Sequence, residues 1–483
     1  MTLASSPPSA PPGARAASVA PEVLNQLKAA LGPGGWSDDP DKLEGRLVEW
    51  RGRWRGDTPL LALPDSVEAV ARLVKVCAQH GVAITPQGGN TGLVAGQLPH
   101  GEILVSTARL NRVRDVSPAD DCMVVEAGVT LFEAQEAAEA AGRLFPLSLA
   151  AEGTATVGGN ISTNAGGTAV LRYGVMRDLV LGLEAVLPNG EVFSGLKRLR
   201  KDNTGYDLKQ VLIGAEGTLG IITAASLKLF PQMRSRATAF VGLENPAKAI
   251  ALLMRAKEET GNGVEAFELM GRLGIDFVLK HIPGTREPMT SRHPWYALIE
   301  IVSAEPGGAE AGLERLLGRA FEDELIADAA VAQNEQQMND LWRIREDQSS
   351  GQKPEGAEWK HDVSVPVSRI ADFIEEASAA VVKFYPGARL VIFGHVGDGN
   401  IHFDVIQPEG GDGHAFAAKR DDGARVVHDI VARYDGSISA EHGLGRMKSQ
   451  EATRYKSAVQ IEAMRAIRGA LDPKRIMNPA VLF

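Results

Sequence analysis

The sequence predicts an α+β protein with two folded regions, and three observations support this prediction. Three glycine-rich clusters separate strand-like runs in the first half of the chain. Strand-like and helix-like segments alternate through most of the second half, which favours an antiparallel sheet with helices on one face. The stretch LVIFGHVGDGNIHFDVI at 390–406 joins two apolar runs through Asp398-Gly399, a strong hairpin signal. With 483 residues, the chain is long enough for two or three cores.

Composition and charge argue against several classes of protein. The chain is 44% hydrophobic, its formal net charge is −10 and it has no basic block, which argues against a nucleic-acid binder. It has no run of about 18 apolar residues, so we expect no membrane-spanning segment. Cys77 and Cys122 form no CxxC pair or disulfide framework, which fits a reducing compartment and a cytoplasmic location. Residues 1–20, rich in Ala, Pro and Ser, predict a disordered tail rather than a signal peptide.

The first region starts with a helix whose ends are marked in the sequence. Asp65 is expected to cap this helix, with Glu68 at the capping-box position, and Gly81 to end it. A strand at 82–85 then runs into PQGGNTG at 86–92. A glycine-rich turn after a strand can expose successive backbone N–H groups to a phosphate. A tight loop without a ligand explains this segment equally well.

Two further glycine clusters, GGNISTNAGG at 158–167 and GAEGTLGIIT at 214–223, favour a bound ligand. Strand-like runs at 122–127, 179–187 and 224–229 lie in the same region. Three glycine-rich loops in one α+β region fit an extended diphosphate ligand that contacts the backbone at several points. The absence of GxGxxG from the chain disfavours a Rossmann dinucleotide site.

The second region carries an arginine in an apolar setting. A helix predicted at 333–350 places Arg345 on the same stripe as Leu341 and Trp342, followed by Ser349. A guanidinium group on an apolar stripe is costly unless it is paired. The partner can be a carboxylate of the protein or an anionic ligand, and the spacing supports both equally.

The predicted hairpin gathers histidines on one face. If Asp398-Gly399 is the loop, His395 lies directly opposite His402, with Cβ atoms roughly 4.5–5.5 Å apart, close enough to share a metal ion. Asp404 is then on the same face as both histidines. Two imidazoles and one carboxylate, with positions left open, are typical of a catalytic zinc or manganese site. The later Glu441-His442 dipeptide is by itself also compatible with a surface turn.

Several segments together resemble known flavoproteins. PQGGNTGL, VGGNISTNAGG, LRYG, RKDNTGYDLKQ and IGAEGTLGIIT resemble the FAD-binding domain of the vanillyl-alcohol-oxidase superfamily, also called the PCMH type after p-cresol methylhydroxylase. GHVGDGNIH, SAEHGLGRMK and LDPKRIMNP resemble the partner domain of FAD-linked D-2-hydroxy-acid dehydrogenases. The resemblance runs from about residue 40 to the C-terminus. Within the superfamily, RKDNTGYDLKQ and SISAEHG are most similar to the D-2-hydroxyglutarate dehydrogenases.

The resemblance implies a two-lobed PCMH-type FAD-binding domain and an antiparallel-sheet substrate domain. The glycine loops contain no histidine or cysteine, so FAD is expected to be bound non-covalently. The implied divisions are a tail at 1–20, a helical and irregular segment at 21–57, the FAD-binding domain at 58–232, a substrate (cap) domain with the hairpin at 233–425 and a C-terminal helical segment returning to the flavin at 426–483. The implied FAD-binding residues are Pro86, Gly88, Gly89, Asn90, Thr91, Gly92, Gly153, Thr156, Gly159, Asn160, Thr163, Asn164, Gly166, Glu216, Gly217, Ile221 and Asn478.

The resemblance also assigns roles around the hairpin. Glu441 becomes the third ligand of a divalent metal, zinc or manganese, and His442 the catalytic base. Arg345, Ser349 and Lys360 are implied to bind the distal carboxylate of the substrate. Asp404 stands where close relatives carry a substrate-contacting asparagine, and an ionised carboxylate there would repel a bound carboxylate.

The implied activity is the FAD-dependent oxidation of a D-2-hydroxy acid, foremost D-2-hydroxyglutarate to 2-oxoglutarate. Hydride passes to the flavin while the metal orients the 2-hydroxyl group. The alternatives are a D-lactate or glycolate dehydrogenase and, from another class, a flavin-binding redox sensor without dehydrogenase activity. Electron-transfer flavoprotein is the implied electron acceptor, and a homodimer is considered.

Overall fold

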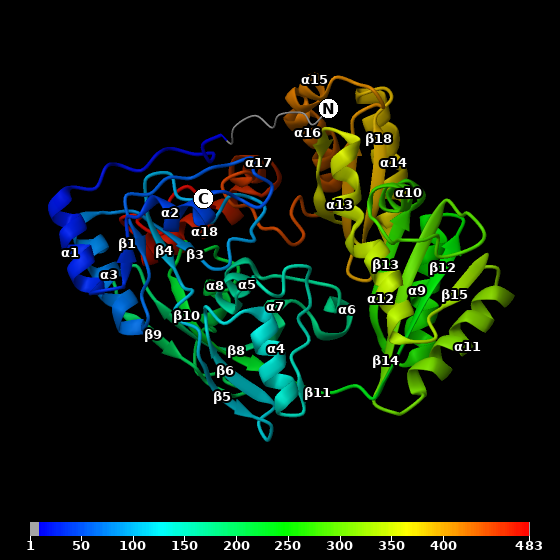
Figure 1. Cartoon of the computed structure of the whole chain (residues 1–483), viewed down its shortest axis with the longest axis horizontal. Coiled ribbons are helices and arrows are strands. Elements are labelled where there is room, and N and C mark those ends of the chain that lie inside the picture. The colour runs from blue at the N-terminus through cyan, green and yellow to red at the C-terminus, as the bar shows by residue number, and fades with distance from the viewer. Residues whose placement is uncertain (1–8, 483) are drawn as a thin grey trace. The chain divides into compact units, whose positions relative to one another are not determined.

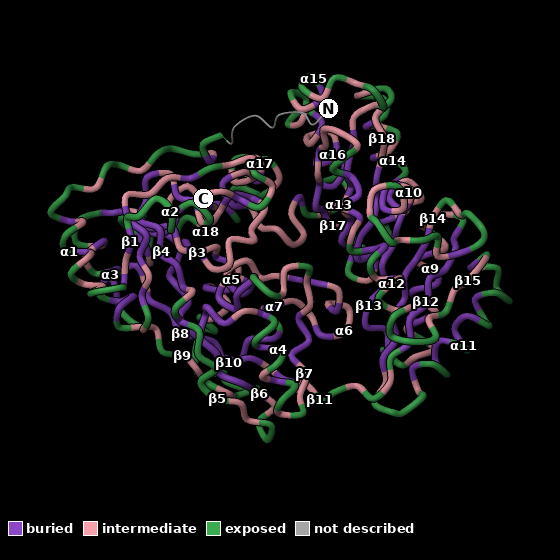
Figure 2. The backbone as a smooth tube through the Cα atoms, viewed as in Figure 1, coloured by how far each residue is buried: buried purple, intermediate pink, exposed green. Residues whose placement is uncertain are grey.

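The computed structural model describes residues 9–482, and its contacts divide the chain into two compact units. The first unit comprises the chain up to Gly167, Val175–Pro231 and the residues from Glu441 onward. The second unit comprises Thr168–Gly174 and Gln232–Ala440. Each unit has sheets of its own and its own buried core, drawn in purple in Figure 2.

One lobe of the first unit is a small sheet with three helices. Its elements are α1 (Pro21–Leu31), β1 (Trp36–Ser37), α2 (Pro40–Leu47), β2 (Leu61–Ala62), α3 (Val67–His80), β3 (Ile84–Gln87) and β4 (Ile103–Ser106). The strand order is β1-β2-β4-β3, and β2, β4 and β3 run parallel. The cap of α3 is Ser66, whose side chain accepts a hydrogen bond from the N–H of Ala69, so the predicted cap at Asp65 is wrong by one residue. Gly81 ends α3 in the left-handed conformation, as predicted.

The other lobe is an antiparallel five-stranded sheet with the order β5-β6-β10-β8-β9. Its strands are β5 (Val113–Ser117), β6 (Cys122–Glu126), β8 (Val180–Val186), β9 (Val192–Gly195) and β10 (Ile221–Lys228). Its helices are α4 (Leu131–Ala140), α5 (Val157–Thr163), α7 (Met176–Leu179) and α8 (Lys209–Leu212), and β7 (Arg143–Leu144) pairs with β11 (Phe230–Pro231). The first unit thus has the two α+β lobes that the sequence predicts.

The second unit is built on one antiparallel sheet, as predicted (Figure 1). Its strands are β12 (Ser235–Leu243), β13 (Val264–Gly271), β14 (Trp295–Ser303), β15 (Asp328–Val331), β16 (Glu358–Trp359), β17 (Asp362–Ser364), β18 (Arg389–His395) and β19 (Asn400–Ile406). The order is β15-β12-β14-β13-β18-β19-β16, and β17 also pairs with β19. β13 and β18 are therefore inner strands, where backbone hydrogen bonds on both sides fix the position of each side chain.

The helices of the second unit cover both faces of this sheet, which adds to the predicted arrangement on one face. They are α6 (Val170–Tyr173), α9 (Pro246–Thr260), α10 (Arg272–His281), α11 (Gly308–Glu322), α12 (Glu335–Glu346), α13 (Gln348–Gln352), α14 (Ile370–Phe384), α15 (Gly413–Ala418) and α16 (Arg420–Arg433). α10 and α12 join Phe240 and Leu298 in one core. Because side chains alternate along a strand, Val241 and Ile299 point to the opposite face, where α9 and α11 contact β12 and β14.

Both ends of the described chain belong to the first unit. α17 (Ser449–Tyr455) and α18 (Ala458–Leu471) form the predicted C-terminal helical segment, and Met477 forms a β-bridge with Ile84. The predicted disordered tail begins outside the described residues. Its described part is hydrogen-bonded, because the N–H of Ser9 donates to Arg53 and that of Ala16 to His100, which differs from a disordered tail. No helix within residues 9–482 is long and apolar enough to span a membrane.

Candidate active site

The hairpin forms, but its register differs from the predicted one. Phe393 is the residue opposite His402, and Val391 is opposite Asp404. His395, which was predicted to lie directly opposite His402, is therefore two residues away from that position. The reason is that the connection between β18 and β19 is longer than Asp398-Gly399. A shift of two preserves the face, since side chains alternate with a period of two. The two imidazole rings still lie close together, with centroids 5.9 Å apart.

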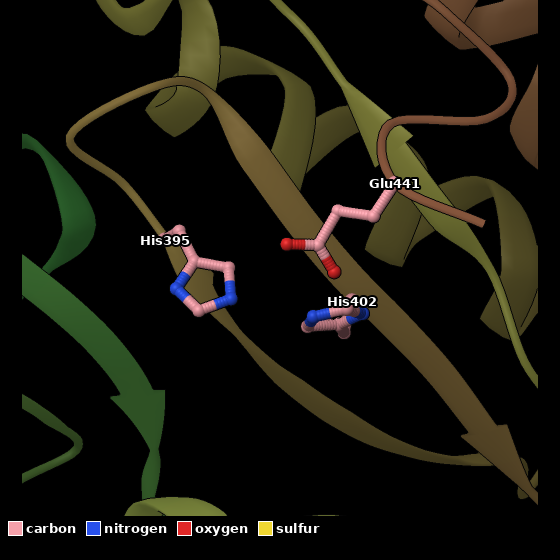
Figure 3. Close-up of side chains that lie close together, drawn as sticks. All are labelled: His395, His402 and Glu441. Atoms are coloured by element: carbon pink, nitrogen blue, oxygen red, sulfur yellow. The ribbon is translucent and has the colours of Figure 1, made fainter. Parts of the chain in front are cut away.

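His395, His402 and Glu441 gather as a candidate metal site. One ligand atom from each lies within 4.8 Å of the other two. Figure 3 shows the carboxylate of Glu441 directed toward the two rings, which come from the end of β18 and from β19. Glu441 follows Ala440 directly, and a bridge between Ser437 and Ser364 attaches this segment to β17. Two imidazoles and a carboxylate are a donor set that suits a catalytic zinc or manganese ion, so these residues fit a metal.

Glu268, on β13, was missed by the sequence analysis and contacts two of the predicted site residues. Its Oε1 accepts a hydrogen bond of 2.6 Å from Nδ1 of His395, and its Oε2 accepts one of 2.7 Å from Nε of Arg345. Burial alone would raise the pKa of Glu268, but the charge of Arg345 and the contacts with His395 lower it to about 2. An ionised carboxylate therefore lies between the two cationic or potentially cationic groups.

Arg345 thus has the internal carboxylate partner that the spacing allowed. It lies near the end of α12, which stops at Glu346, and Ser349 belongs to the separate short helix α13, so the predicted single helix is divided in two. The guanidinium carbon lies 4.9 Å from the centre of the Phe393 ring, and Nη2 lies 3.4 Å from Nε2 of His395. Arg345 is therefore next to the metal candidate while being neutralised by Glu268.

Lys360 has two carboxylate partners, Asp404 and Glu358. Its Nζ lies 3.3 Å from Oδ2 of Asp404 and 3.3 Å from Oε2 of Glu358. The register of β16 with β19 pairs Trp359 with Val405, so Lys360 follows directly opposite Asp404. Asp404 is almost fully buried. Asp404, which stands where close relatives carry asparagine, therefore contacts the lysine that the resemblance implies as a substrate-binding residue.

The first and second glycine clusters meet at the end of β3. A Cβ atom added to Gly89 would lie 1.8 Å from the carbonyl oxygen of Thr154, and one on Gly88 would lie 2.3 Å from Oγ1 of Thr156. Thr156 caps α5 by accepting a hydrogen bond from the N–H of Gly159. Only glycine allows the backbone at Gly89 to approach that of Thr154 and the side chain of Thr156 to approach Gly88 so closely. Asn160 in the same helix has a buried Nδ2 for which the described residues provide no hydrogen-bond partner.

The third cluster and the C-terminus join the same part of the first unit. A Cβ on Gly217 would lie 2.6 Å from Pro86. The carboxylate of Glu216 accepts hydrogen bonds of 2.9 and 2.8 Å from the N–H groups of Leu444 and Gly445, and Nδ2 of Asn478 donates to its carbonyl oxygen at 2.9 Å. The side chain of Glu216 therefore holds the loop after His442. Of the other predicted cofactor residues, Gly153 has open space at its Cβ, and Ile221 packs into the core.

Comparisons with known proteins decide the family. Residues 58–195 match the FAD-binding domain model, and residues 232–482 match the C-terminal domain of FAD-linked oxidases. D-2-hydroxyglutarate dehydrogenase, mitochondrial, of Arabidopsis thaliana is 36% identical over 457 residues, covering 94% of this chain and 80% of the relative. D-2-hydroxyglutarate dehydrogenase of Xanthomonas citri is 35% identical over 464 residues, covering 96% and 97%. The chain belongs to the D-2-hydroxyglutarate dehydrogenase family. It is thus an FAD-dependent oxidoreductase, and the resemblance stated from its motifs is confirmed.

Solved structures agree on the fold of this family member. p-Cresol methylhydroxylase with substrate bound aligns with a TM-score of 0.75 at 15% identity, covering 95% of this chain and 96% of that chain. Alkyldihydroxyacetonephosphate synthase aligns with a TM-score of 0.72 at 18% identity, covering 98% and 89%. These likenesses confirm the predicted PCMH-type fold. The close approaches of Gly88 to Thr156, of Gly89 to Thr154 and of Gly217 to Pro86, together with the buried amide of Asn160, fit the FAD of this fold.

One feature of the sequence could have indicated Glu268 as a site residue. It lies in the apolar run VEAFELMG, whose strand is buried along nearly its whole length. A carboxylate in such a strand requires a partner, as Arg345 did. Its partners are 77 and 127 positions away, however, and no local pattern identifies pairs at that separation.

Proposed function

We propose that this family member oxidises D-2-hydroxyglutarate to 2-oxoglutarate at a site containing a divalent metal. The proposal rests mainly on one observation, the cluster of His395, His402 and Glu441 beside Arg345. The names of the relatives support the substrate, since those proteins are called D-2-hydroxyglutarate dehydrogenases. The His/His/Glu donor set supports zinc, with manganese as the alternative.

The reaction removes two electrons and two protons from the substrate carbon and its hydroxyl group. FAD, when bound by the glycine clusters, supplies the acceptor for the hydride from the α-carbon, and a divalent ion held by His395, His402 and Glu441 would supply a Lewis acid for the hydroxyl. We assign to His442 the general base that takes the hydroxyl proton, a role that imidazole suits near neutral pH. The C–H and O–H bonds break as the C=O bond forms.

The remaining polar residues would orient the substrate. Arg345 and Ser349 are proposed to hold the distal carboxylate together with Lys360. Arg345 contacts Glu268, and Lys360 contacts Asp404 and Glu358, so the substrate adds a negative charge to cations that already have carboxylate partners. Binding of the second carboxylate therefore depends on hydrogen bonds from these groups more than on net charge.

The balance of charge favours a second candidate, a D-lactate or glycolate dehydrogenase. Asp404 pairs with Lys360 and would face the distal carboxylate of hydroxyglutarate, which lactate and glycolate lack. Anaerobic mixing of the yellow holoprotein with D-2-hydroxyglutarate, D-lactate and glycolate separates the candidates. We expect the flavin to bleach fastest with D-2-hydroxyglutarate. Faster bleaching with lactate or glycolate would overturn the assignment, and a flavin that no substrate bleaches would indicate a redox sensor.

Three further assignments complete the proposal. Electron-transfer flavoprotein is proposed as the electron acceptor on the resemblance to FAD-linked dehydrogenases, and its reduction by the substrate-reduced enzyme tests this. A cytoplasmic location is supported by two free, buried cysteines and is tested by fractionation of the source cells. A homodimer is proposed as the working assembly, and light scattering of the holoprotein decides it.

A further inference from the structure

We infer that Glu268 is a positioning residue that serves the metal ligand His395 and the substrate residue Arg345 at the same time. This inference rests on the proposed function for the roles of those two partners. The role of Glu268 would be to set the orientation of one imidazole and one guanidinium group with the two oxygens of a single carboxylate.

The position of Glu268 is set by the sheet. Glu268 on β13 is the residue paired with His395 on β18. On its other side, Glu268 pairs with Leu298 of β14. A directly paired residue on an inner strand has little freedom, because hydrogen bonds on both sides fix its backbone. The carboxylate is therefore a rigid support for the ring of His395.

The contact with His395 selects one tautomer. The 2.6 Å contact joins Nδ1 of His395 to a carboxylate oxygen of Glu268, and a carboxylate oxygen accepts the hydrogen bond, so Nδ1 is the nitrogen that carries the proton. Nε2 then bears the lone pair when the imidazole is neutral. That nitrogen is the atom required for a metal, and a carboxylate behind a ligating histidine raises its basicity and fixes its orientation. The same contact thus prepares His395 to bind a metal.

The second oxygen of Glu268 acts on Arg345. It accepts the Nε–H of Arg345 at 2.7 Å, while the guanidinium lies over the ring of Phe393. These two contacts define the plane of the guanidinium group. They direct Nη2 of Arg345 toward Nε2 of His395, and these two atoms lie 3.4 Å apart. One carboxylate therefore links the predicted metal ligand with the predicted substrate arginine.

A purely structural buried ion pair is the competing explanation, and the same strand offers a matched control. Glu265 is also buried on β13 and forms an ion pair with Arg236 at 3.0 Å. It contacts no residue assigned to the metal or the substrate among the contacts of the described chain. Replacing either glutamate by glutamine removes one buried negative charge from the same strand. Only Glu268→Gln removes it from behind a metal ligand.

The experiment measures how tightly the FAD-containing protein holds metal. Wild type, Glu268→Gln, Glu268→Asp and Glu265→Gln are loaded with zinc, and zinc is competed away with a chromogenic chelator. In Glu268→Gln the amide can accept from only one of its two donor partners, so we expect zinc affinity to fall about 10- to 100-fold while FAD stays bound. The KM for D-2-hydroxyglutarate should also rise, through Arg345. Glu265→Gln should keep the wild-type affinity for zinc.

Several outcomes would overturn the inference. Zinc affinity of Glu268→Gln within twofold of wild type would do so, as would an equal loss in Glu265→Gln, or a wild type that binds no zinc. If Glu268→Gln does not fold, Glu268→Asp keeps the charge but withdraws the oxygens, and unchanged zinc affinity there would contradict the positioning role. The zinc measurement needs no substrate. A protein whose zinc affinity depends on Glu268 but which fails to oxidise D-2-hydroxyglutarate would therefore refute the proposed function and leave this inference standing.

Discussion

The two units position their functional groups in different ways, one through close backbone contacts and the other through buried pairs of charged side chains. In the first unit, small residues bring backbone segments together, as where Gly89 meets Thr154. In the second unit, charged side chains are buried in pairs, Arg345 with Glu268 and Lys360 with Asp404. A backbone site is sensitive to added volume, whereas a site of paired charges is sensitive to lost or altered charge. Substitutions in the two units should therefore fail differently, one by losing cofactor and the other by losing turnover or selectivity.

The largest effect is expected at the proposed base. His442→Ala should lower the rate of anaerobic flavin reduction about 10²- to 10⁴-fold, the usual contribution of a general base. Zinc and FAD contents should remain those of wild type, because His442 is assigned to neither. Stopped-flow absorbance of the flavin and metal analysis check both points. A reduction rate near that of wild type would remove His442 from the mechanism.

A methyl group should be enough to disturb the cofactor side. Gly89→Ala places a Cβ where the carbonyl of Thr154 already lies, so FAD affinity should fall at least about tenfold as the two backbones separate. The ratio of flavin to protein absorbance after gel filtration measures this. Gly469→Ala is the matched control, since its Cβ meets nothing within 4 Å. Equal FAD content in both variants would contradict the backbone description of the first unit.

Changing one charge should alter selectivity on the substrate side. Asp404→Asn removes one of the two carboxylates that contact Lys360, which leaves Glu358 and makes the lysine a stronger cation for the distal carboxylate of the substrate. We expect the ratio of kcat/KM for D-2-hydroxyglutarate over D-lactate to rise about tenfold, mainly through KM for the dicarboxylate. Steady-state kinetics with both substrates measure this ratio. A ratio that is unchanged or falls would place Lys360 outside the substrate site.

The smallest effect is expected at a charge cluster remote from the hairpin histidines. Burial favours a higher pKa for Glu355, but hydrogen bonds from His281, Lys280 and Arg389 lower it to about 2. An unfolded glutamate has its pKa near 4.5, so this stabilisation is complete above about pH 4.5 and is lost as the pH falls toward 2. Glu355→Gln should lower the urea midpoint at pH 7, with a smaller difference at pH 3 and normal turnover at pH 7. A difference that is constant with pH would contradict this cluster.

Local patterns predicted the elements of the site more fully than the contacts between them. The hairpin, its two histidines and their common face follow from alternation around Asp398-Gly399, and that face survives the two-residue shift in register. The shift itself depends on the length of the turn, which Asp-Gly alone does not fix. Glu268, the partner of His395, lies on a strand 127 positions away, and Lys360, the partner of Asp404, lies between β16 and β17, 44 positions away. Their positions depend on the order of strands in the sheet, which periodicity does not specify.

The same difference explains the results in the first unit. The glycine clusters were predicted to share a ligand because glycine-rich turns can expose backbone N–H groups to a phosphate, and the three clusters do meet around Gly88, Thr156 and Gly217. Glu216, predicted to contact the cofactor, uses its carboxylate to bind the loop at Leu444 and Gly445. That contact joins residues separated by more than 200 positions, and no spacing rule indicates it.

The central claim is that the hairpin and Glu441 hold a metal that the oxidation requires. The most direct measurement removes the metal from the FAD-containing protein with a chelator, verifies by elemental analysis that it is gone, and mixes the protein anaerobically with D-2-hydroxyglutarate. The flavin should remain yellow, and stoichiometric zinc or manganese should restore bleaching. Bleaching of the metal-free protein at the wild-type rate would contradict the claim.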